Sequence, residues 1–98
     1  MGWNWDHAQT IESRSYNAHA ELGEHLRNIA PRADWQALQA LFARDSDGFD
    51  IQPAQAARIA EALKALAPHA GPTWNRACLD LGASAAAAAR SNAVWHWT

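Results

Sequence analysis

Five histidines and one cysteine are the side chains of this 98-residue chain best suited to bind a metal or attack a substrate. No two histidines are four residues apart, the helical spacing of HExxH zinc sites, and Cys78 has no second cysteine to complete a zinc site. Glu21 and His25 would share a helix face, which is more typical of a surface interaction than of half a metal site. The sequence therefore predicts neither a metal centre nor a bound cofactor.

Three aspartates and a glycine stand together in the segment DSDGFD, residues 45–50. A calcium-binding EF-hand loop has glycine at its sixth position and glutamate at its twelfth. Counted from Asp45, Gly48 is fourth and Ala56 is twelfth, so the spacing does not match. Aspartate and glycine are frequent in turns because of their backbone geometry, and we interpret the segment as a polar turn.

Nucleophilic catalysis receives no support from the sequence. Cys78 falls on the apolar face of an expected helix, where a free cysteine usually acts as a small hydrophobic side chain. The chain contains no GxSxG motif, no glycine-rich phosphate loop and no dinucleotide fingerprint. We therefore predict no catalytic residue, although a motif search leaves open an active site assembled from residues far apart in the chain.

Composition and charge narrow the classes of function further. Hydrophobic residues make up 49% and charged residues 18% of the chain, which is typical of one globular domain, here expected to span residues 1–98. The net charge is −2 and the eight basic residues are scattered singly, which argues against nucleic-acid binding. No apolar segment approaches the roughly 20 residues that cross a bilayer. With one cysteine and no basic-then-apolar leader, we expect a cytoplasmic protein.

Apolar residues recur at helical spacing in four segments. The expected helices span residues 15–30, 34–44, 53–67 and 73–90. Ser15 and Thr73 are suited to cap helix N-termini, and Pro53 suits the first position of a helix. Asn92 tolerates the left-handed backbone that often follows a helix. The run ASAAAAAR favours close packing against a neighbouring helix and, as the alternative, offers a smooth surface for a partner.

Four of the six tryptophans stand in pairs near the two ends of the chain: Trp3, Trp5, Trp95 and Trp97. Residues two apart on a strand project to the same side, and aromatic pairs across strands contribute about 0.2 to 1 kcal/mol each. We therefore predict that residues 2–6 and 93–97 pair in a small sheet with one face packed on the helices. His96 would point to the side of its strand opposite Trp95 and Trp97. Residues 49–51 are a candidate third strand. As the alternative, both ends would be disordered tails.

The expected fold is thus α+β and mainly helical, with about four helices and a small antiparallel or mixed sheet formed by the N- and C-terminal strands. The chain combines an opening Met1-Gly2-Trp3, a Phe49-x-Ile51-x-Pro53 segment that leads into an alanine-rich helix, and a closing Trp95-x-Trp97. In these features it resembles a group of small uncharacterised domains from actinobacteria and their phages. The resemblance implies a free-standing cytoplasmic domain of a class in which accessory, regulatory and host–phage conflict proteins are common. It implies no catalytic or binding residue.

Because no catalytic set is visible and tryptophan is enriched in binding hot spots, our first hypothesis is a non-catalytic protein-binding module, a small inhibitor or regulator in host–phage conflict. The candidate contact residues are Trp3, Trp5, Trp95, His96, Trp97, Asp45 and Asp47. The alternative is a small-molecule-binding protein or small enzyme with a tryptophan-lined pocket, to which His7, His96 or Trp74 would contribute. A homodimer joined through the edge of the terminal sheet or along the last helix is compatible with either.

Overall fold

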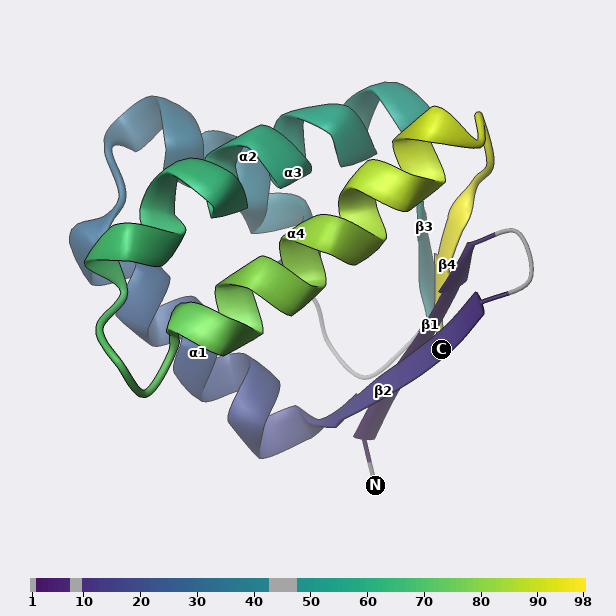
Figure 1. The fold of residues 1–98 in the computed structure, drawn as a ribbon. Helices are drawn as coiled ribbons and strands as arrows, with labels where there is room; N and C mark the ends of the chain where they lie inside the picture. Colours follow the sequence, from purple (N-terminus) through teal and green to yellow (C-terminus); the bar gives the residue numbers. More distant parts are fainter. Residues whose placement is uncertain (1, 8–9, 43–47) are drawn as a thin grey trace.

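The computed structural model describes residues 2–7, 10–42 and 48–98 and shows a sheet on one side of the molecule with helices covering its inner face (Figure 1). In chain order the elements are β1 (Gly2–His7), β2 (Thr10–Ser15), α1 (Tyr16–Ile29), α2 (Arg32–Phe42), β3 (Phe49–Ile51), α3 (Pro53–Leu66), the short 3-10 helix η1 (Ala67–His69), α4 (Asn75–Arg90) and β4 (Trp95–Trp97). This is the expected mainly helical α+β fold.

The helices follow the apolar periodicity of the sequence, with small shifts at their ends. Helix α3 begins with Pro53 at its first turn, as predicted, and Asn92 beyond α4 has a φ of 51°. Both outcomes confirm the expected backbone roles of these residues. The prediction for Thr73 is wrong: the N-cap residue of α4 is Trp74, and its side chain makes no capping hydrogen bond. Helix α2 begins at Arg32, and its expected end at residue 44 lies outside the described residues.

The two ends of the chain lie next to each other in the sheet, whose strand order is β2-β1-β4-β3. All three neighbouring pairs are antiparallel, with Trp5 of β1 opposite Trp97 of β4 and Phe49 of β3 on the other side of Trp97. The predicted pairing of the termini and the third strand at residues 49–51 are both confirmed. The alternative of two disordered tails is wrong, because the terminal strands are the two central strands of the sheet.

Strand β2 was not predicted from the sequence. It pairs with β1 along its whole length, from Gly2 opposite Ser15 to His7 opposite Thr10. Its sequence, TIESRS, contains a single strongly apolar residue, so hydrophobic alternation gives no signal for a strand. The segment becomes a strand because β1 offers hydrogen-bonding groups along one edge, and those groups come from another part of the chain.

Aromatic rings fill the space between the sheet and the helices, in a group that we call the aromatic cluster: Trp5, Phe49, Trp95 and Trp97. The Trp97 ring stacks between Trp5 and Phe49, with centroid separations of 4.6 and 5.5 Å. Trp95 meets Trp97 edge-on at 5.2 Å. These separations lie in the range of favourable aromatic pairs. The cluster therefore joins strands β1, β4 and β3 through side chains as well as through backbone hydrogen bonds.

Candidate functional site: a groove between helices α3 and α4

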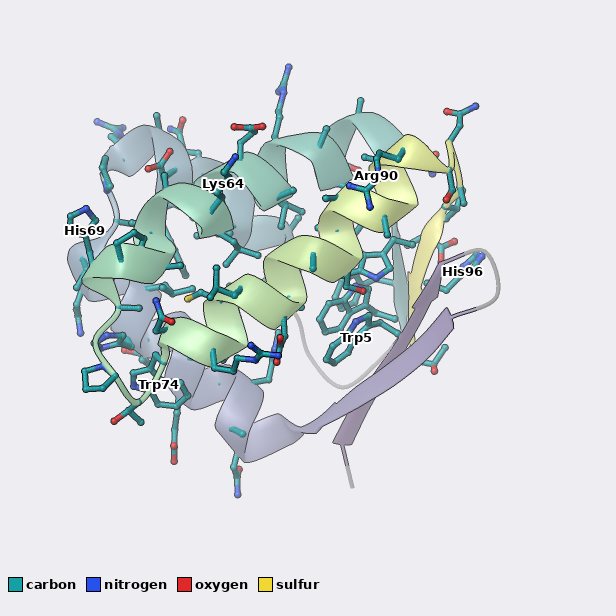
Figure 2. All side chains as sticks on the ribbon, viewed as in Figure 1. Trp5, Lys64, His69, Trp74, Arg90 and His96 are labelled. Atoms are coloured by element: carbon teal, nitrogen blue, oxygen red, sulfur yellow. The ribbon has the colours of Figure 1, made fainter. Side chains whose placement is uncertain are left out.

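Three of the tryptophans that we expected on a contact surface lie in the hydrophobic core. The side chains of Trp95 and Trp97 are fully buried, and Trp5 is 6% exposed. The indole N–H of Trp5 donates a hydrogen bond to Ser84 Oγ on α4 at 3.0 Å, which fixes the ring between the sheet and that helix. Figure 2 shows Trp5 in this position, between α4 and the strands of the sheet. A partner could touch these three rings only if the sheet moved away from the helices, so they are removed from the candidate contact surface.

The other proposed contact residues have different positions. His96 lies on the outer face of the sheet, and its Nδ1 is 2.6 Å from Asp50 Oδ1 on β3. Both side chains are about half exposed, and exposed pairs of this kind contribute little to stability. Trp3 lies on β1 with a side chain outside the description, and Asp45 and Asp47 lie outside the described residues.

The two histidines of α1 have structural roles. His19 is buried, its Nε2 donates to the Leu41 carbonyl at 2.9 Å, and its ring stacks on Phe42 at 4.5 Å. His25 Nε2 donates to the Ala70 carbonyl at 2.7 Å. Among residues 2–7, 10–42 and 48–98, no group of three histidine, cysteine or acidic side chains is placed to hold a metal ion.

The residues suggested for a tryptophan-lined pocket do not come together. The ring of Trp74 lies near that of His25, with 6.0 Å between centroids, whereas His96 is on the outer face of the sheet. His7 lies on β1 with a side chain outside the description. A hollow of about 220 Å³ between α1 and α2 is lined in part by Trp35 and Phe42. This hollow involves none of the residues that we proposed for a pocket.

The larger hollow lies between α3 and α4 and has a volume of about 430 Å³. We call it the α3/α4 groove; its walls are formed by Ala60, Glu61, Lys64, Cys78, Leu79, Gly82, Ala83, Ala86 and Arg90. The two helices lie side by side in Figure 1. They approach closely at Gly82, where an added Cβ would lie 3.3 Å from the Cβ of Leu63. Glycine and alanine therefore supply much of the lining of the groove where the two helices meet.

Helix α4 has two faces of different character. One face is buried in the core and consists of Ala77, Cys78, Leu81, Ser84, Ala85 and Ala88. The other borders the groove with Leu79, Ala83, Ala86 and Arg90, at intervals of four, three and four residues. Such intervals place side chains in one line along a helix. The second line is therefore arranged like a helix-packing surface, although no helix of the described chain covers it.

Leu79 stands out on this surface. Its side chain is 45% exposed, and among the residues that the structure describes no other large hydrophobic side chain is classed as exposed. A single exposed leucine is ordinary on a protein surface, but Leu79 borders the α3/α4 groove rather than standing alone. It therefore offers an apolar side chain beside a space into which a partner's side chain could fit.

Two cations and one acid border the same groove: Lys64 and Glu61 of α3 and Arg90 of α4. Figure 2 shows Lys64 and Arg90 on the same face of the molecule. Within the described ranges, neither cation forms an ion pair, whereas Arg76 and Asp80 of α4 pair with each other at 3.1 Å. The groove therefore carries a local net charge of +1, from two cations and one acid, on a chain whose net charge is −2.

Leu79, Lys64 and Arg90 are absent from the contact residues predicted from the sequence, because in the expected helices 53–67 and 73–90 apolar spacing identifies only the side that faces the core. The run ASAAAAAR offers a smooth surface for a partner as an alternative, but its residues alone do not show which side of the helix that surface occupies. The available signal was the second apolar line on the same helix, at positions 79, 83 and 86. This line predicts a surface but not a hollow, because the hollow depends on how α3 lies beside it.

No helix of the described segments is long and apolar enough to cross a membrane. A family model for a domain of unknown function, DUF7739, matches residues 6–98. No curated protein and no solved structure matches the chain. The family match agrees with the resemblance to small uncharacterised domains, while an origin in actinobacteria or phages stays a prediction.

Proposed function

The chain belongs to the DUF7739 family of domains of unknown function, and we propose that it is a non-catalytic protein-binding module. The contact surface in this proposal is the α3/α4 groove, and its occupant is an amphipathic helix of another protein. The observation that carries the proposal is the exposed Leu79 beside a hollow of about 430 Å³. Grooves between helices that present apolar side chains are a recurrent site for amphipathic helices.

A helix suits this groove better than an extended segment does. An extended peptide gains much of its affinity from backbone hydrogen bonds to a sheet edge. The α3/α4 groove offers no such edge, because its walls are two helices whose own backbone groups are bonded internally. The lining residues Gly82, Ala83 and Ala86 are small, so a third helix could lie close to α4 and bury its apolar side chains.

A wider role is also part of the proposal: a small inhibitor or regulator in conflict between bacteria and their phages, acting in the cytoplasm. Its support is the likeness to small uncharacterised domains of that setting, together with the lack of a recognisable catalytic motif in the sequence. The groove is an argument for binding of a partner, but it does not indicate the biological pathway in which the partner acts.

The test compares three forms of the full chain: wild type, Leu79→Asp and the control Gln39→Asp. Gln39 is an exposed residue of α2, outside the groove, so the control adds the same charge elsewhere. Proteins captured from cells that naturally express the chain are identified, purified and titrated against each form. We expect a partner whose affinity falls at least about tenfold with Leu79→Asp and stays unchanged with Gln39→Asp, because a buried apolar contact is replaced by a desolvated carboxylate. A purified partner that binds all three forms equally would overturn the proposed surface.

A further inference from the structure

The charges around the α3/α4 groove indicate which charges a helix bound there should carry. We infer that the partner helix is acidic, with one carboxylate directed to Lys64 and a second, about two helical turns away, directed to Arg90. This inference rests on the proposed function, since it takes the groove as the contact surface. It names the chemistry of the partner, which the apolar lining alone does not.

The spacing of the two carboxylates follows from the positions of the two cations. Gly82 of α4 lies against Leu63, the neighbour of Lys64, so Lys64 is near the level of Gly82 along the groove. Arg90 is eight residues further along α4. At 1.5 Å per residue this separation is roughly 12 Å, which seven or eight residues of a partner helix would span. Carboxylates at positions i and i+7 lie on the same side of a helix and therefore match the two cations.

Both cations are free to accept a partner's carboxylate. Neither forms an ion pair among the residues that the structure describes, and both side chains are exposed. A guanidinium such as that of Arg90 can bind a carboxylate through two parallel hydrogen bonds, and an ammonium such as that of Lys64 binds as a point charge. Glu61 borders the groove with them and would oppose a uniformly acidic helix. The partner is therefore expected to carry two separated carboxylates on this face rather than a continuous acidic run.

A second copy of this chain fits the charges less well than an acidic helix. The 4-3-4 spacing from Leu79 to Arg90 reads the same in both directions, so an antiparallel second α4 would place Leu79 of one copy level with Arg90 of the other. Lys64 lies nearer to Leu79 than to Arg90 along the groove of its own copy, so it would face the Arg90 of the second copy. Two cations would meet there, and like charges facing each other weaken an interface.

The experiment uses the full chain and three synthetic helical peptides of 15 residues with the same leucine and alanine line. They differ only at positions i and i+7 of the groove-facing side, which carry Glu, Gln or Lys. Binding is measured by fluorescence anisotropy with wild type, Lys64→Glu/Arg90→Glu, Leu79→Asp and the control Arg58→Glu. Arg58 is an exposed cation of the same helix as Lys64 that does not line the groove.

With wild type and Arg58→Glu, we expect the Glu peptide to bind about fivefold more tightly than the Gln peptide and more tightly still than the Lys peptide. The difference should shrink as salt is added, because exposed charges are screened. With Lys64→Glu/Arg90→Glu, the order should reverse in favour of the Lys peptide.

The other outcomes separate the two proposals. Equal binding of the Glu and Gln peptides, abolished by Leu79→Asp, would overturn the acidic partner and leave the groove as the contact surface. Failure of every peptide to bind wild type would overturn both proposals. Light scattering that shows a wild-type dimer, lost with Leu79→Asp, would overturn the acidic helix in favour of a second copy.

Discussion

The aromatic cluster and the α3/α4 groove are two regions of this small protein in which neighbouring elements pack through side chains of very different size. Large rings pack between the sheet and the helices, and small side chains pack between α3 and α4. At the inner face of the sheet, indole rings fill the space between the strands and the helices, and Trp95 and Trp97 are fully buried. Between α3 and α4, glycine and alanine bring the helices close but leave a hollow of about 430 Å³ above them. The tryptophans of this sequence thus fill the core between the sheet and the helices, whereas its glycine and alanine residues line a hollow on the surface.

The comparison also separates stability from recognition. A buried tryptophan removes about 150 to 250 Å² of surface from water, so each of the buried indoles of Trp5, Trp95 and Trp97 contributes several kcal/mol to folding. The groove residues remain partly in water in the free protein, so changes there should alter binding more than stability. Four substitutions test this contrast, in decreasing order of their expected effect on the free energy of unfolding.

Trp97→Ala should cause the largest loss, because it removes the ring between Trp5 and Phe49 and leaves a cavity at the centre of the sheet. We expect a destabilisation of about 3 to 5 kcal/mol, measured by chemical denaturation. The control His96→Ala, at the neighbouring exposed position, should cost less than about 1 kcal/mol. A loss with Trp97→Ala no larger than that of the control would contradict the central role of the aromatic stack.

Ser84→Ala should have an intermediate effect. It removes the hydroxyl that accepts the hydrogen bond of the Trp5 indole N–H inside the core. The expected destabilisation is about 1 to 3 kcal/mol, since a buried donor loses its acceptor. Ser91→Ala, at an exposed position beyond α4, serves as the control and should be nearly neutral. If the two variants unfold at the same denaturant concentration, the link between β1 and α4 does not contribute to stability.

Asp50→Asn should have a small effect, because its partner His96 and Asp50 itself are about half exposed on the outer face of the sheet. We expect a loss of less than about 1 kcal/mol, and it should decrease further at high salt. Thermal unfolding at two salt concentrations measures both quantities. A loss above about 2 kcal/mol would show that this pair holds β3 to β4, a role that we assign to the aromatic cluster.

Leu79→Asp should change stability least, within about 0.5 kcal/mol, because Leu79 lies outside the core and is 45% exposed. The same variant should lose the helical partner of the groove. Circular dichroism and thermal unfolding of the free protein, followed by titration with the partner, measure the two effects separately. A strongly destabilised variant would instead indicate that Leu79 supports the packing of α3 on α4.

The fold was largely predictable and the candidate site was not. Apolar spacing located the helices, and the paired tryptophans indicated strands at both ends of the chain. Strand β2 was not predicted, because it is stabilised by hydrogen bonds to β1 and its own residues show no hydrophobic alternation. The burial of Trp5, Trp95 and Trp97 also exceeded what the spacing could show, since alternation gives a shared side but not which side faces the helices.

The sequence by itself determined the local elements of this protein: helices from their 3.6-residue period and proline positions, and terminal strands from alternating tryptophans. Local periodicity suffices for these features because each depends on residues a few positions apart. Only the tertiary structure decided that the indoles lie in the core and that Lys64, Leu79 and Arg90 border one groove. These features depend on the distance between elements that are remote in the chain, and that distance is set by the sizes of the side chains packed between them.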